Sequence, residues 1–77
     1  MTRAHDRDWR QRVLRTLGER VRTARRERAL TQQKLAELLD ISVAYVSLIE
    51  RGARNPPYTT IRAIARALQV PASRLYL

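Results

Sequence analysis

The segment Thr31-Gln-Gln-Lys-Leu-Ala-Glu-Leu-Leu-Asp-Ile-Ser-Val-Ala-Tyr-Val-Ser-Leu-Ile-Glu50 has the pattern of two short helices joined by a tight turn. Thr31 and Ser42 can each cap a helix, because a hydroxyl oxygen accepts a hydrogen bond from a free N–H of the first turn. Between them, Asp40 tolerates the left-handed backbone conformation that closes such a turn. The pattern therefore predicts a helix-turn-helix unit over residues 31–51, with its second helix over residues 42–50.

Apolar residues in this segment recur at helical spacing and predict which side of each helix faces the core. Leu35, Ala36 and Leu39 form the inward stripe of the first helix, and Val46 and Ile49 form that of the second. We expect the two helices to cross at Ala36, because a small side chain lets their backbones come close.

The composition indicates one small soluble domain with a polyanionic partner. The 77 residues include 16 basic and 7 acidic side chains, a net charge of +9. Every basic residue except Lys34 is an arginine, whose planar fork suits phosphate groups. There is no cysteine, and no apolar run approaches the ~18 residues of a membrane span. We therefore expect an intracellular protein that does not bind membranes.

The rest of the chain also predicts helices, so the expected fold class is all-α. Residues 1–8 lack apolar periodicity and are expected to be flexible, and residues 9–77 are expected to form a single domain. Helical periodicity predicts one long helix from Trp9 to about Arg28, a further helix over Tyr58–Leu68 and a short last helix over Ala72–Tyr76. Gly18 within the long helix suggests a close approach of another element.

Three motifs resemble the lambda-repressor-like (Cro/C1, XRE-type) DNA-binding domain. They are Thr31-Gln32-x-x-Leu35-Ala36, then Ile41-Ser42-x-x-x-Val46-Ser47-x-Ile49-Glu50-Arg51-Gly52, then Arg54-Asn55-Pro56. The resemblance extends over about Leu17–Tyr76 and implies a compact five-helix domain, here with an extended first helix. Its turn usually carries glycine where this chain has Asp40. Small controller and repressor proteins of prokaryotes and phages are similar, which implies a cytoplasmic, nucleoid-associated protein.

The resemblance implies that the third helix lies in the major groove of double-stranded DNA. Transferred position by position, the base-facing residues are Val43, Ala44, Ser47 and Leu48. The residues expected at the DNA backbone are Gln32, Gln33, Lys34, Ser42, Tyr45, Arg51, Arg54 and Asn55. The predicted recognition helix has no Arg, Lys, Asn or Gln, the residues that read bases through paired hydrogen bonds. Sequence preference is therefore expected to depend on thymine methyl groups, DNA shape and dimer spacing.

The resemblance also implies a structural ion pair and a homodimer. The pair joins Arg25 to Glu50 at the end of the recognition helix. A two-fold dimer would read palindromic or pseudopalindromic half-sites about 34 Å apart. The candidate dimer residues are Tyr58, Val70, Leu75, Tyr76 and Leu77, although Leu75 and Tyr76 also suit the domain's own core.

Two questions stay open at this stage. The apolar side of Trp9–Thr16, which the family pattern does not require, either folds back on the domain or meets a partner protein. The chain is either a DNA-binding transcriptional regulator or a protein-interaction module, such as an antitoxin, in which DNA binding is secondary or absent. An enzyme is not expected, because His5 is the only histidine and no catalytic, metal-ligand or nucleotide-binding motif is present. The sequence predicts no metal and no cofactor.

Overall fold

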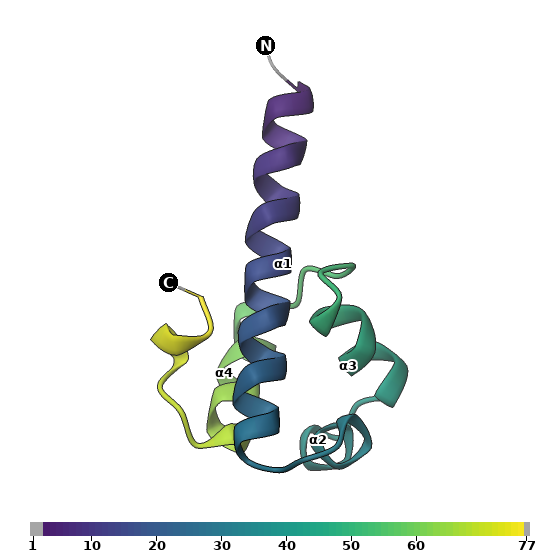
Figure 1. Cartoon of the computed structure of the whole chain (residues 1–77). Helices are drawn as coiled ribbons and strands as arrows, with labels where there is room; N and C mark the ends of the chain where they lie inside the picture. The colour runs from purple at the N-terminus through teal and green to yellow at the C-terminus, as the bar shows by residue number, and fades with distance from the viewer. Residues whose placement is uncertain (1–2, 77) are drawn as a thin grey trace.

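The computed structural model describes residues 3–76 of the chain, and the side chains of residues 8–76. The described residues form the α-helices α1 (Arg3–Glu27), α2 (Gln32–Leu39), α3 (Val43–Glu50) and α4 (Tyr58–Leu68) and the short 3-10 helix η1 (Ala72–Arg74). The helices α2, α3 and α4 pack around the C-terminal half of α1, whose N-terminal half projects beyond them (Figure 1). The fold is therefore all-α, as the sequence predicts.

Two predicted elements differ from the observed ones. The helix α1 begins at Arg3 rather than Trp9, so most of the segment expected to be flexible is helical; Met1 and Thr2 lie outside the described residues. The fifth helix predicted over Ala72–Tyr76 is only the three-residue η1. Five α-helices were therefore one too many for the part of the chain that the structure describes. The backbone after Pro71 closes i→i+3 hydrogen bonds, from Arg74 N–H to the Pro71 carbonyl at 3.0 Å and from Leu75 N–H to the Ala72 carbonyl at 2.9 Å, which make a 3-10 turn and not an α-helix.

The core forms where the predicted apolar stripes meet. Every helix from α1 to α4 contributes, and Leu75 closes one end of the core with none of its surface exposed. Ala36 is buried on the inner side of α2, and the crossing of α2 and α3 at this residue stays a prediction. The buried apolar residues are Leu17, Val21, Ala24, Leu35, Ala36, Val46, Ile49, Ile64, Ala65, Leu68 and Leu75.

Local hydrogen bonds start and end the helices of the helix-turn-helix unit. The hydroxyls of Thr31 and Ser42 each accept a backbone N–H at 3.0 Å, from Lys34 and Tyr45. Asp40 ends α2 in the left-handed conformation with φ of 58°, as the sequence predicts. Gly52, with φ of 76°, follows α3, and the next N–H, of Ala53, reaches back 2.8 Å to the Leu48 carbonyl. These bonds fix the turn on each side of α3.

At Gly18, the backbone of α1 lies close to the backbone at the end of α3. A Cβ atom at residue 18 would lie 2.5 Å from the carbonyl oxygens of both Ile49 and Glu50. No side chain fits there unless α3 moves, which explains a glycine inside a long helix.

We predict that Gly18→Ala destabilises the protein by about 1–3 kcal/mol, because the added methyl group overpacks the contact between α1 and α3. Helix propensity alone would give the opposite sign, a gain of about 1 kcal/mol. Urea unfolding followed by circular dichroism measures the difference. Thr23→Ala, at an exposed site of the same helix, serves as the control and should change stability by less than about 0.5 kcal/mol. A stabilised Gly18→Ala protein would contradict the close approach.

Candidate nucleic-acid interface

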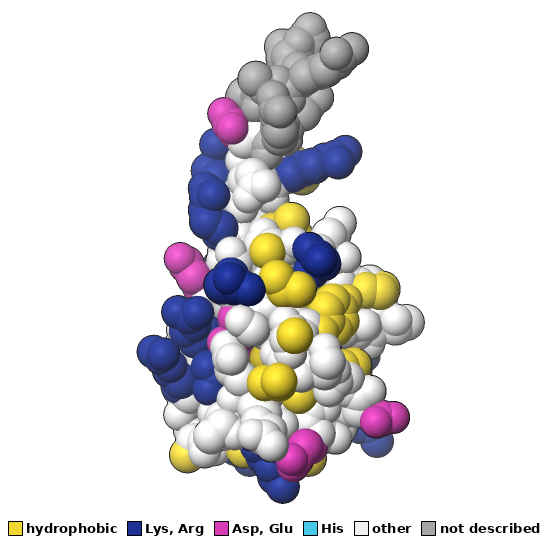
Figure 2. All heavy atoms as spheres, turned by 90° about the vertical axis from the view of Figure 1, so that its right-hand side faces the viewer, with side chains coloured by type: hydrophobic (Ala, Val, Ile, Leu, Met, Phe, Trp, Pro, Cys, Tyr) yellow, Lys and Arg dark blue, Asp and Glu magenta, His cyan; other side chains and the backbone are white. Residues whose placement is uncertain are grey.

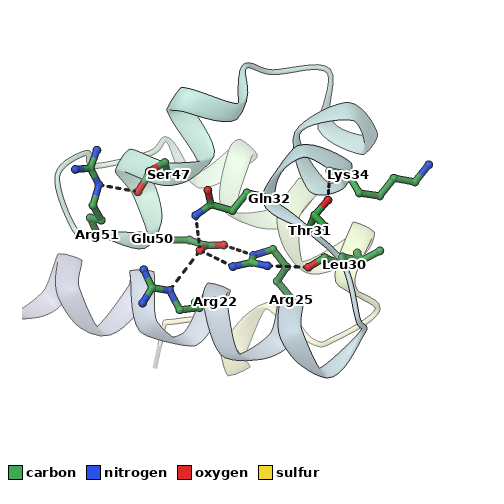
Figure 3. Close-up of polar contacts among 9 residues, drawn as sticks. All are labelled: Arg22, Arg25, Leu30, Thr31, Gln32, Lys34, Ser47, Glu50 and Arg51. Carbon is green, nitrogen blue, oxygen red and sulfur yellow. Dashed lines mark hydrogen bonds and ion pairs between the residues drawn. The ribbon is translucent and has the colours of Figure 1, made fainter.

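A buried ion cluster holds α3 against α1. The Arg25 Nε and Nη2 atoms donate to the two carboxylate oxygens of Glu50 at 2.6 and 3.0 Å. The third donor, Nη1, reaches the Leu30 carbonyl at 2.7 Å, and Gln32 Nε2 donates to Glu50 Oε1 at 3.0 Å. Arg22 Nε lies 3.5 Å from the same oxygen (Figure 3). The geometry agrees with the expected Arg25–Glu50 pair and adds two partners, Arg22 and Gln32.

The cluster keeps Glu50 ionised although its side chain is fully buried. Burial alone would raise the pKa of Glu50, because it disfavours the charged carboxylate. The hydrogen bonds from Arg25 and Gln32 and the positive charge of Arg25 act in the opposite direction and lower the pKa below its usual value. The position of α3 therefore depends on a charged glutamate.

The outer side of α3 is predominantly apolar. Val43 is 46% exposed and Ala44 is also exposed, whereas Ser47 and Leu48 are half-buried. Tyr45 packs partly against the core, and the Ser42 hydroxyl caps the helix. Of the four residues expected to face bases, Val43 and Ala44 at the start of α3 are thus the most accessible.

Polar and basic side chains lie next to this apolar surface in the chain. Gln33 and Lys34 are exposed in the first turn of α2, and Arg51, Arg54 and Asn55 are exposed just after α3. Figure 2 shows the side of the molecule that carries α2 and α3: apolar side chains gather in its middle, and lysine or arginine side chains lie beside them and along one edge. The arrangement suits a groove with a phosphate backbone at its rim.

Gln32 occupies a different place from that expected for a free DNA contact. Its amide nitrogen donates to Glu50 and the residue is half-buried, so it first of all joins α2 to α3. Sequence reasoning missed this role, and that of Arg22. The spacing of Arg22 and Arg25, three residues apart on one side of a helix, was the available signal for Arg22.

The candidate dimer residues divide into three groups. Leu75 is fully buried in the domain's own core, one of the two places that the sequence left open for it, and is not exposed for a dimer contact. Val70 is half-buried, and Leu77 lies outside the described residues. Tyr58 and Tyr76 are 55% and 38% exposed, and their rings meet edge to face with centroids 5.9 Å apart. Only this tyrosine pair offers a sizeable apolar surface among the candidates that the structure describes.

Within residues 3–76, none of the helices combines the length and the apolar character needed to cross a membrane. Residues 8–76, whose side chains the structure describes, contain no group of three or more His, Cys, Asp or Glu side chains that could hold a metal ion.

We predict that Glu50→Gln lowers the unfolding free energy at neutral pH by about 3 kcal/mol, because it leaves the buried Arg25 without a counter-charge. Stability should also depend on pH in a defined way. The pKa of Glu50 is lower in the folded than in the unfolded state, so its contribution is complete above the unfolded value of about 4.3 and is lost as the pH falls through the folded value.

Urea unfolding of the wild-type protein and of Glu50→Gln between about pH 3 and pH 7 measures the contribution of Glu50 to stability. The acid loss of stability in the wild type should be smaller in Glu50→Gln. Glu19→Gln, at an exposed site of α1, is the matched control and should follow the wild type. Parallel pH curves for Glu50→Gln and the wild type would show that Glu50 does not carry the effect.

Comparison with known proteins agrees with this geometry. Residues 21–75 match the family HTH_3, described as helix-turn-helix. The immunity repressor protein of Bacillus phage phi105 is 42% identical over 60 residues, which cover 78% of this chain and 42% of the repressor. The transcriptional repressor RghR of Bacillus subtilis is 42% identical over 57 residues, 73% of this chain and 42% of RghR. This chain therefore spans less than half the length of both repressors.

The fold also matches a solved structure over nearly its whole length. The restriction-modification controller protein C.AhdI from Aeromonas hydrophila superposes with a TM-score of 0.78 at 35% identity, covering 82% of this chain and 96% of that one. These relatives are two repressors and a restriction-modification controller protein. The chain belongs to the helix-turn-helix family of lambda-repressor-like, XRE-type regulators.

Proposed function

We propose that this protein is a transcriptional regulator that binds double-stranded DNA with α3 in the major groove. The observation that carries the proposal is a capped α3 with an exposed first turn, followed directly by the exposed Arg51 and Arg54. Lys34 adds an exposed positive charge in the first turn of α2. The net charge of +9 and the repressors among the relatives support it. A protein with this role would act in the cytoplasm, on the nucleoid.

The proposed contacts divide into those that read bases and those that hold the backbone. Val43 and Ala44 meet base edges first, with Ser47 and Leu48 deeper in the interface. The residues that bind phosphates are the exposed Gln33, Lys34, Arg51, Arg54 and Asn55. Ser42, which caps α3, and the half-buried Tyr45 and Gln32 add further contacts to the DNA backbone. Since apolar groups can distinguish thymine by its methyl group but cannot pair with other base edges, direct readout is limited.

We further propose that two copies bind a palindromic or pseudopalindromic site. A monomer with about four phosphate contacts would bind weakly at physiological salt, and a second copy doubles them. Tyr58 and Tyr76 are the candidate centre of the interface, supported by their exposure and by Arg62, whose Nη1 donates to the Tyr58 hydroxyl at 2.9 Å. Aromatic residues and arginine are enriched in such interfaces.

Selection of bound sequences from a random duplex pool, at two salt concentrations, tests the function and the symmetry together. The expected result is an enriched palindrome with half-sites about one helical turn apart. Enrichment of a single half-site would leave the DNA-binding proposal intact but contradict the dimer. If the protein retains and enriches no duplex from the pool, the result would contradict both the DNA-binding proposal and the dimer proposal and would favour the protein-interaction function.

We predict that Arg54→Ala weakens binding to all duplexes by a similar factor and reduces the slope of log affinity against log salt by about one unit. Arg54 is exposed after α3 and its Nη1 bonds only its neighbour's carbonyl, of Ala53, so the substitution should not unfold the protein. Fluorescence anisotropy at several salt concentrations measures the slope. Arg66→Ala, at an exposed site on α4, is the control. An unchanged slope for Arg54→Ala would remove that residue from the phosphate contacts.

We predict that Val43→Ala changes sequence preference more than it changes overall affinity. Val43 is 46% exposed at the start of α3, so its methyl groups are available to thymine without serving the core. Replacing thymine by uracil in the selected site should weaken wild-type binding by about 1 kcal/mol or more at a contacted position and affect Val43→Ala less. Equal losses for the two proteins would exclude contact between Val43 and a thymine methyl group.

A further inference from the structure

The N-terminal half of α1 carries an open apolar groove that the proposed DNA interface does not use. Trp9 and Val13 form one wall and are 58% and 44% exposed. The buried Leu17 and Leu75 and the exposed Tyr76 also line the groove, which has a volume of about 560 Å³. The segment Trp9–Thr16 therefore does not fold back on the domain, one of the two arrangements that the sequence left open.

The groove and α3 lie on opposite sides of α1. At 100° per residue, Thr16, which lines the groove, is turned about 160° around the helix from Gly18, which touches α3. Figure 1 agrees, since α3 and the C-terminal segment flank α1 on different sides. A molecule in this groove would leave the outer surface of α3 free.

The side chains around the groove are those that dominate protein interfaces. Binding energy concentrates in Trp, Tyr and Arg residues at the centre of a contact. Here Trp9, Tyr76 and Arg12 line one groove. Trp9, Val13 and Leu17 are four residues apart and lie in one line along α1, on which the apolar residues of a second helix, spaced three or four apart, can pack.

Charge indicates which kind of helix fits. At 100° per residue, Arg10 and Arg12 lie on opposite sides of the line that joins Trp9 to Val13 along α1. Arg20 continues the same line toward the C-terminal end of the helix. Within residues 8–76 none of these three arginines has an ion-pair partner. A second copy would bring the same positive charges into the contact, which is unfavourable. An acidic occupant would neutralise them.

We propose that this groove binds an acidic amphipathic helix of a partner protein. Its apolar residues, three or four positions apart, would pack on Trp9, Val13 and Leu17, while flanking Asp or Glu residues would pair with Arg10 and Arg12. The line from Trp9 to Arg20 corresponds to about three helical turns, or roughly 16 Å. The proposal does not depend on DNA binding, although the groove shares Tyr76 with the dimer interface proposed above.

The fluorescence of Trp9, the only tryptophan of the chain, reports on the groove directly. The probe is a synthetic helical peptide of about 16 residues, with leucines every three or four positions and flanking glutamates. The matched peptide carries lysine in place of each glutamate. We expect a saturable blue shift of the emission with the acidic peptide only. Arg12→Glu should weaken binding about tenfold, because it places a like charge against the peptide.

Arg26→Glu makes the same charge change at an exposed site at the other end of α1 and should leave peptide binding unchanged. Far-UV circular dichroism confirms that both variants remain helical. Three results would overturn the proposal: no saturable shift up to about 1 mM peptide, an equal response to the lysine peptide, or unchanged binding by Arg12→Glu. A shift that follows protein concentration alone, with a dimer in ultracentrifugation that Val13→Glu abolishes, would also overturn it, because a second copy would then occupy the groove.

Discussion

The arrangement of the helices depends on the buried contact between Arg25 and Glu50. Removing two charges from water is unfavourable, and only complete pairing offsets it. Here the guanidinium of Arg25 bonds both carboxylate oxygens and the Leu30 carbonyl, while Gln32 adds a donor from α2. One carboxylate thus links α1, α2 and α3. Any shift of α3 along α1 would leave a charged group unpaired in the core, so the contact selects one position of the helix.

Gly18 determines how closely α3 can approach α1 in that position. Without a Cβ atom, α1 meets the backbone at the end of α3, and the Glu50 carboxylate comes within reach of Arg25. Because the inner side of α3 is used for this contact and for the core, only its first turn and outer side remain exposed. Those positions carry valine, alanine, serine and leucine, so the DNA recognition that we propose would rely on shape and methyl groups more than on hydrogen bonds.

The sequence was sufficient to predict the features that depend on interactions between residues close together in the chain. The caps Thr31 and Ser42 and the left-handed Asp40 each act within a few residues, and all three were predicted correctly. Tertiary packing decided the rest. The burial of Leu75 and the bond from Gln32 to Glu50 depend on which elements meet in space, which no spacing in the chain encodes. The early start of α1 escaped prediction because residues 3–8 lack the apolar periodicity on which the prediction relied.

The two opposite sides of α1 make different contacts. One side meets α3 through Gly18 and Arg25, and the other lines the groove through Trp9, Val13 and Leu17. A ligand changes a second site only if it binds two conformations with different affinity. The α1 helix is continuous from Arg3 to Glu27, and the ion cluster fixes α3 on it, so the described part of the chain shows no second arrangement for a groove ligand to select. Occupation of the groove would therefore act by bringing a partner close to DNA and not by reorienting α3.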